Sequence, residues 1–223
     1  MNAFPNRLRS IASAALSAAL VVGAPAATPV LAQAPAAPQA QAGAADLDNA
    51  VAALRAISTM QAAFTQTDRN GQRVSGTLTL KRPGRIRFQY QPGIPMLIVG
   101  DGSALTLVDY EVKQVQRWPI KNSPLGALLD PTRDVKKYGT LVPLGDPAMI
   151  GVTVRDRGHP EYGVITLYFQ RKGGAPGGLE LIGWDATDSQ SKRTSIRLSG
   201  HRYGMAIADT MFRFNDPRRT TRR

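Results

Sequence analysis

The stretch 76–90 alternates apolar and polar side chains on both sides of a Pro-Gly pair. Its apolar positions are Leu78, Leu80, Ile86, Phe88 and Tyr90. Successive side chains of a strand point to opposite faces, so each arm has one apolar face and one polar face. Pro83 and Gly84 favour a turn, because proline cannot donate a ladder hydrogen bond and glycine accepts unusual backbone angles. The stretch therefore predicts a hairpin in a sheet with one apolar face.

A longer period predicts one helix ahead of this hairpin. From Asp46 to Gln66, apolar residues recur at three- and four-residue steps, and no proline interrupts them. They form one stripe on a helix of about five turns, with Asp46 or Asp48 as its N-cap. The opposite face carries few lysines or arginines, so we expect this helix to pack on the sheet rather than lie on a membrane.

The strand pattern continues along the rest of the chain. Three strands separated by tight turns are expected at 95–100, 104–109 and 112–120, as in an antiparallel meander. Six more β-like segments follow, at 140–144, 150–155, 164–171, 179–186, 194–200 and 210–215. The expected fold is therefore mainly β with helices (α+β), built on one large curved antiparallel sheet.

A helical insertion separates the two groups of strands. Ser123 places a capping hydroxyl before a proline at the first helical position, and Leu125, Leu128 and Leu129 follow on one side. Residues 132–138 are expected to form a second short helix. A three-leucine face on so short a helix is either a plug over the sheet or a movable cover for a cavity.

The N-terminal region is typical of an export signal. Arg7 and Arg9 precede an apolar, alanine-rich run at 11–27, and small residues stand before a cleavage point at Ala32, with Ala34 as the alternative. We therefore expect a signal peptide at 1–32 and a periplasmic location. A flexible Ala/Pro/Gln linker at 33–45, the folded domain at 46–217 and a basic tail at 218–223 complete the expected organisation.

Charge and composition narrow the class of function. The formal net charge of +12 favours anionic partners such as lipid headgroups or acidic proteins, while export disfavours nucleic acid. The absence of cysteine excludes thiol chemistry, disulfides and lipidation of the chain itself. His159 and His201 lie in turns that look solvated and lack metal-ligand spacing, and no nucleophile elbow or phosphate loop occurs. We expect no metal, no cofactor and no enzyme activity.

The chain is also rich in large apolar side chains. Residues 96–99 and 164–169 are apolar on both faces of their strands, and Trp118 and Trp184 add bulk. Two interpretations remain open: a filled core, or a curved sheet that leaves a hollow for an apolar ligand.

The order of these motifs resembles the periplasmic lipoprotein carrier family, LolA. The likeness covers about residues 46–217, and its most specific part is the Lys81-Arg-Pro segment with the aromatic strand behind it. It continues through Ser123-Pro-Leu to the closing Phe212-Arg-Phe. The resemblance implies an incomplete antiparallel β-barrel with a long N-terminal helix and a short helical lid around a hydrophobic cavity. It also implies carriage of lipoprotein acyl chains without catalysis.

The resemblance implies a site as well. Arg82 would hydrogen-bond to the lid and act as its latch, while Ile86 and Phe88 stand where the family usually has phenylalanine and tryptophan. We expect the cavity to be lined by Leu80, Ile86, Phe88, Tyr90, Ile98, Leu107, Trp118, Leu125, Leu128 and Leu129.

The implied partners are lipoproteins, an inner-membrane lipoprotein-releasing ABC transporter, and an outer-membrane receptor or the outer membrane itself. We expect the protein itself to be a monomer. Two alternatives remain: a carrier or sensor of another lipid or glycolipid in the same cavity, and a non-catalytic β adaptor that binds anionic surfaces.

Overall fold

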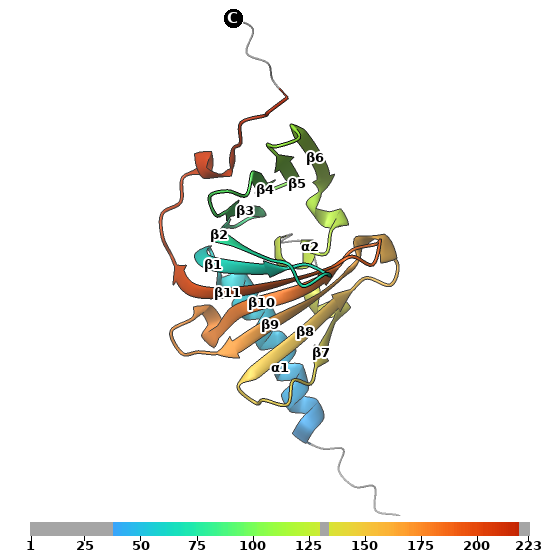
Figure 1. Cartoon of the computed structure of the whole chain (residues 1–223). Coiled ribbons are helices and arrows are strands. Elements are labelled where there is room, and N and C mark those ends of the chain that lie inside the picture. Colours follow the sequence, from blue (N-terminus) through green and yellow to red (C-terminus); the bar gives the residue numbers. More distant parts are fainter. Residues whose placement is uncertain (1–37, 130–133, 219–223) are drawn as a thin grey trace, which may run out of the picture. The chain divides into compact units, whose positions relative to one another are not determined.

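A single antiparallel sheet frames the part of the chain that the computed structural model describes, residues 38–129 and 134–218. Its eleven strands follow the order β6-β5-β4-β3-β2-β1-β11-β10-β9-β8-β7 (Figure 1). Their bounds are β1 Thr59–Thr67, β2 Arg73–Lys81, β3 Arg85–Tyr90, β4 Met96–Asp101, β5 Ala104–Asp109, β6 Gln114–Pro119, β7 Gly139–Val142, β8 Met149–Arg155, β9 Val164–Arg171, β10 Leu179–Thr187 and β11 Arg193–Tyr203. The sheet is open, with β6 and β7 at its two edges.

One long helix and several short helices accompany the sheet. The α-helices are α1 Pro38–Ala56, α2 Gly126–Leu129 and α3 Val135–Tyr138, and the 3-10 helices are η1 Ile120–Asn122, η2 Pro160–Tyr162, η3 Pro176–Gly178 and η4 Asp209–Phe212. Helix α1 crosses the inner face of the sheet and contacts β7, β8 and β10 (Figure 1). Its Ala50, Ala53 and Leu54 are buried there, so the helix fills much of the space that the curved sheet encloses.

The core lies between α1 and the inner face of the strands. Phe64 on β1 makes edge-to-face contacts with Phe88 and Tyr90 of β3, each at a centroid distance of 5.3 Å. Phe88 also meets Trp184 of β10 edge-on at 6.2 Å. Edge-to-face aromatic pairs contribute free energy beyond that of burying the rings. These contacts therefore help to hold the two halves of the sheet together around one apolar centre.

The outer face of β3–β5 carries a second, smaller cluster. Phe212 packs against Leu97, Val99 and Val108, which point away from α1. We call residues 205–215 the C-terminal strap. Lys81 Nζ donates to the Ile207 carbonyl at 2.7 Å, so both polar and apolar contacts hold the strap on the sheet.

The predicted hairpin is confirmed. Strands β2 and β3 pair antiparallel, with Leu80 opposite Ile86 and Leu78 opposite Phe88, and the turn falls at Pro83-Gly84. The meander 95–120 and the strands at 140–200 are likewise present with small shifts of their ends. Alternation was therefore a sufficient signal for this hairpin, whose apolar face packs on the core.

The predicted helix at 46–66 is wrong in its second half. Helix α1 ends at Ala56, and β1 occupies Thr59–Thr67 between β2 and β11. Positions 57, 60 and 64 satisfy a helical period, but Met60, Ala62 and Phe64 also alternate, and all three are buried. Pairing with strands on both sides decided the ambiguity. The helix also begins at Pro38, inside the segment expected as a linker; residues 33–37 lie outside the described residues.

Two further differences concern short segments. The strand expected at 210–215 is absent, because η4 and the extended strap place Phe212 on the outer cluster instead of in a ladder. The second short helix of the insertion is α3, which begins after Asp134; that side chain caps it by accepting from the Lys137 amide at 2.9 Å. The remaining residues 132–133 of the expected helix lie outside the described part.

Candidate functional site

A pocket of about 720 Å³ opens on the inner side of the sheet, between β3–β6, β10, β11 and the segment around η1 and α2. Its volume is within the range typical of ligand sites, ~300–1,000 Å³. The apolar lining residues are Phe88, Ile98, Leu105, Trp118, Leu125, Trp184, Ala186 and Ile196. An apolar floor of this kind offers no directional contact and suits a hydrocarbon group.

Polar side chains surround this floor. They include the carboxamides of Gln66, Gln116, Asn122 and Gln190 and the charged groups of Glu161, Asp188 and Lys192. Tyr90 donates from its hydroxyl to Gln66 Oε1 at 2.7 Å. Burial raises the pKa of Tyr90 to about 12, although the hydrogen bond to Gln66 opposes the change. The phenol therefore stays a donor and holds the Gln66 amide in one orientation at the pocket.

The structure divides the expected cavity residues into two groups. Phe88, Ile98, Trp118 and Leu125 line the pocket. Leu80, Ile86, Tyr90, Leu128 and Leu129 are instead buried in the core cluster. Leu107 is half-buried on the same face of β5 as Leu105, and Leu105 lines the pocket in its place. Part of the expected cavity is thus packed solid, and an open pocket remains beside it.

Arg82 joins the hairpin turn to the short helix α2. Its Nη2 donates to the Leu128 carbonyl at 3.1 Å, and its backbone amide donates to the Ser58 carbonyl at 2.9 Å. Burial, with a smaller contribution from Arg55, lowers the pKa of the Arg82 guanidinium. Its buried Nε has no hydrogen-bond partner in the described part of the chain. Arg82 is therefore a partly buried cation held to α2 through one side-chain hydrogen bond.

Helix α2 covers the core with apolar side chains. Leu128 and Leu129 are almost completely buried, and the segment before them is folded tightly on η1. Ser123 does not cap α2 as expected: the helix begins at Gly126, and the Ser123 hydroxyl donates to the Ile120 carbonyl at 2.9 Å. The proline that follows lies in a turn rather than at the first helical position, so α2 begins later than its sequence indicated.

Trp184 lines the pocket, although it was not among the expected cavity residues. Along β10, Leu179 and Leu181 face the core, and simple alternation would place Gly183 there. A bulge between Leu181 and Gly183 shifts the register by one residue, so Trp184 faces inward. Gly183 has φ of 151°, and a Cβ there would meet the Ile196 carbonyl at 2.2 Å. The glycine itself is the signal that could have indicated the bulge.

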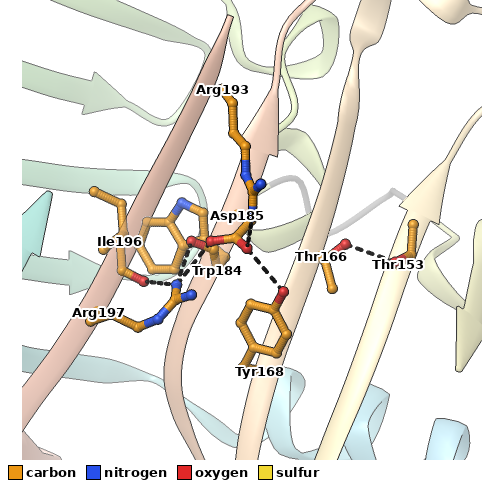
Figure 2. Close-up of polar contacts among 8 residues, drawn as sticks. All are labelled: Thr153, Thr166, Tyr168, Trp184, Asp185, Arg193, Ile196 and Arg197. Atoms are coloured by element: carbon orange, nitrogen blue, oxygen red, sulfur yellow. Dashed lines mark hydrogen bonds and ion pairs between the residues drawn. The ribbon is translucent and has the colours of Figure 1, made fainter. Parts of the chain in front are cut away.

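On the opposite face of β10, Asp185 lies in a network of hydrogen bonds (Figure 2). Its carboxylate accepts from Arg193 and Arg197, each at 2.9 Å, and from the Tyr168 hydroxyl at 3.0 Å. Partial burial acts to raise the Asp185 pKa, but the hydrogen bonds from Arg197, Ser195, Arg193 and Tyr168 together lower it to about 2. The network ties β9, β10 and β11 together on the outer face.

The histidines do not form a catalytic or metal-binding group. His159 is exposed, stacks on Tyr162 and contacts Glu161 at 3.0 Å. His201 was expected in solvent, but its side chain is only 3% exposed and its Nε2 contacts the Leu181 carbonyl at 2.8 Å. Its ring also stacks on the Tyr203 ring, with the centroids 5.9 Å apart. Across residues 38–129 and 134–218, no group of three or more histidine, aspartate or glutamate side chains could hold a metal ion.

A search of the described helices finds none that combines the length and apolar character of a transmembrane span. The curved sheet packs on a helix and carries an open pocket with an apolar floor and a polar rim, an arrangement that suits a binding protein. The family model described as outer membrane lipoprotein carrier protein LolA matches residues 55–215, and the chain belongs to this family. Its members are periplasmic carriers, not enzymes.

Two relatives agree with this assignment in sequence. An outer-membrane lipoprotein carrier protein of Dechloromonas aromatica (strain RCB) is 32% identical over 176 residues, 74% of this chain and 80% of its own. That of Xanthomonas campestris pv. campestris (strain B100) is 31% identical over 172 residues, 72% and 79%. A solved structure of a LolA superfamily protein from Nitrosomonas europaea aligns with a TM-score of 0.40 at 11% identity, over 77% of this chain and 97% of that one.

Proposed function

We propose that this protein accepts the acyl chains of lipoproteins released from the inner membrane and carries them across the periplasm to the outer membrane. The observation that carries the proposal is the hydrogen bond between Arg82 and Leu128, next to the apolar pocket. It joins the hairpin to the short helix that covers the core. The relatives' shared description as outer-membrane lipoprotein carriers supports the same function.

The packing supports a site that enlarges on loading. With α2 in place, Leu128 and Leu129 take up space in the same core cluster as Leu80 and Ile86. Displacement of α2 would free that space and join it to the pocket. Each methylene of an acyl chain that leaves water contributes ~0.8 kcal/mol, so a chain of ordinary length outweighs the loss of the leucine contacts.

Release of the cargo requires that α2 can be opened and closed at a modest cost in free energy. A hydrogen bond to a charged donor contributes about 1.5–3 kcal/mol net. One such bond at Arg82 holds α2 firmly enough to favour the covered form, yet the binding energy of a partner protein suffices to break it. We propose that an inner-membrane releasing transporter supplies the cargo, and that an outer-membrane receptor or the outer membrane itself takes it.

Export is part of this proposal. The expected signal peptide at 1–32 lies outside the described residues, so its support is the charged, apolar and small-residue pattern of the sequence. N-terminal sequencing of protein recovered from the periplasmic fraction tests it. A start at residue 33 or 35 supports export, whereas an intact Met1 in the cytoplasmic fraction contradicts it.

The decisive experiment uses spheroplasts from the host, incubated with the purified exported protein and an energy source. Lipoproteins should leave the membrane and co-purify with the protein as a soluble complex. The control is that the same membranes release lipoproteins to a known carrier. If they do so but release none to this protein, the proposed function as a lipoprotein carrier is wrong. Lipid extraction from the purified protein would then examine the alternative of a carrier for another lipid or glycolipid.

A further inference from the structure

A second hollow lies on the outer face of the sheet, away from the apolar pocket. It has a volume of about 580 Å³ and is formed by the end of α3, edge strand β7 and the end of β8. Its lining residues include Lys137, Arg155 and Arg157, with Thr140 and Thr153 between them. Among the residues that the structure describes, the lining contains three cations and no carboxylate, and the two hollows share no lining residue.

The charges of these three cations are not neutralised within the described fold. Within residues 38–129 and 134–218, Lys137, Arg155 and Arg157 form no ion pair, and all three are exposed. Lys137 Nζ lies over the ring of Tyr138, 5.2 Å from its centroid, which leaves the ammonium beside the hollow. Arg193 and Arg197 on the same face of the sheet differ, since both pair with Asp185 (Figure 2).

The neighbouring carboxylates are already engaged by the backbone. Asp134 Oδ1 accepts from the Lys137 amide at 2.9 Å, as the cap of α3. Asp156, between the two arginines, is 6% exposed, and its Oδ1 accepts from the Gly158 amide at 3.0 Å. Neither side chain lines the hollow. The positive charge there is therefore left for a ligand from outside the chain.

We propose that this hollow binds a phosphate group. Arginine offers paired N–H donors that match the oxygens of phosphate, and a phosphate carries enough charge and acceptors for three cations. Thr140 faces Thr153 across the β7–β8 ladder on this same face, so hydroxyl groups line the floor between the cations. The phosphate comes either from an anionic phospholipid headgroup or from a free phosphate compound, and the two sources share this chemistry.

The site is independent of the carrier function. Val152 and Val154 point from β8 into the core, whereas Thr153 points outward and contacts Thr166 on the outer face (Figure 2). The sheet thus separates the phosphate site from the apolar pocket. Loss of phosphate binding leaves acyl-chain uptake intact, and failure of the lipoprotein release experiment says nothing about this site.

The test compares two double variants of the exported protein that remove the same charge. Arg155→Gln with Arg157→Gln alters the hollow, and Arg69→Gln with Arg73→Gln alters two exposed arginines at the turn between β1 and β2. Binding of inorganic phosphate is followed by calorimetry. Binding to vesicles of phosphatidylcholine with phosphatidylglycerol is followed by sedimentation, against vesicles of phosphatidylcholine alone.

The hollow variant should bind at least about tenfold more weakly, whereas the control variant changes less than about twofold. If the hollow variant loses binding to vesicles but not to free phosphate, the natural ligand is a lipid headgroup. If it loses binding to free phosphate but not to vesicles, the natural ligand is a soluble phosphate compound. Either result supports the site. An equal loss of binding in both double variants would show that the overall positive charge of the protein is responsible, and it would overturn the proposal. Absence of binding to both probes, with circular dichroism unchanged, also overturns it.

Discussion

Arg82 in the turn after β2 and Leu128 in α2 are joined by a hydrogen bond of 3.1 Å from the Arg82 Nη2 to the Leu128 carbonyl. The two residues are far apart in the sequence, and this bond connects the β2–β3 hairpin to the short helix α2, whose leucines are buried in the core. The acceptor is a backbone carbonyl, so the contact does not depend on the identity of the side chain at position 128.

Replacement Arg82→Leu should loosen α2 without unfolding the sheet. The amides of Leu128 and Leu129 donate to the Leu125 carbonyl inside this short segment, so their hydrogen exchange reports its opening. We expect exchange about tenfold faster or more, from loss of a charge-assisted hydrogen bond. Arg85→Leu is the matched control, because it removes an arginine that pairs with Asp209 on the strap. Equal exchange in both variants would rule out the latch.

Replacing the two tryptophans at the pocket should affect different properties: Trp184 mainly the stability of the fold, and Trp118 mainly the uptake of ligand. Trp184 is 1% exposed in the core, so Trp184→Ala should lower the free energy of unfolding by about 3–5 kcal/mol. Trp118 is half-buried on edge strand β6, so Trp118→Ala should cost less than about 1.5 kcal/mol yet weaken uptake of a fluorescent fatty acid severalfold. Urea unfolding and fluorescence titration measure the two quantities. A Trp118→Ala variant with full uptake would show that the pocket does not hold the probe.

Asp185 should contribute to acid sensitivity. Its pKa in the folded protein is about 2, below the ordinary 3.8, because hydrogen bonds from two arginines outweigh its partial burial. The stabilisation is therefore complete above about pH 4 and is lost as the pH falls toward 2. Asp185→Asn should lower stability near pH 7 by about 1–2 kcal/mol, since exposed arginine partners are screened by solvent.

The same variant should also unfold with a shallower pH dependence between about pH 4 and 2. Urea midpoints for wild type and variant across this interval measure the difference. If the two curves remain parallel, the Asp185 network does not account for acid sensitivity.

The C-terminal strap should detach when its apolar anchor is removed. Phe212 is 5% exposed against Leu97, Val99 and Val108, so Phe212→Ala should cost about 2–4 kcal/mol of local stability. Limited proteolysis should then cut within 205–215 well before the sheet. Met211→Ala is the control, because that side chain is 44% exposed and only its carbonyl contacts Arg87. Proteolysis at equal rates in both would mean that the polar contacts alone hold the strap.

Several features of this protein follow from the sequence alone. The hairpin at 76–90 was predictable because its alternation matches one buried and one exposed face, and Pro83-Gly84 excludes a continuous strand. The family was predictable from the Lys81-Arg-Pro segment and the aromatic strand behind it, and the matched range 55–215 confirms it. These signals are local: each depends on a few neighbouring side chains and on the geometry of one element.

Other features depended on contacts between segments far apart in the chain. Met60 and Phe64 fit both a helix and a strand, and only the neighbouring β2 and β11 made the segment a strand. Trp184 reached the pocket through a bulge that offsets β10 by one residue against β9.

The division between solid core and open pocket was likewise a matter of tertiary structure. Hydrophobicity marks Leu80, Ile86 and Phe88 equally, and all three are buried in one core cluster, yet Phe88 also lines the pocket. Sequence thus determined which faces are apolar and which family the chain joins. Tertiary structure decided which apolar side chains meet each other and which remain open to a ligand, because packing in three dimensions depends on how distant elements fill one volume.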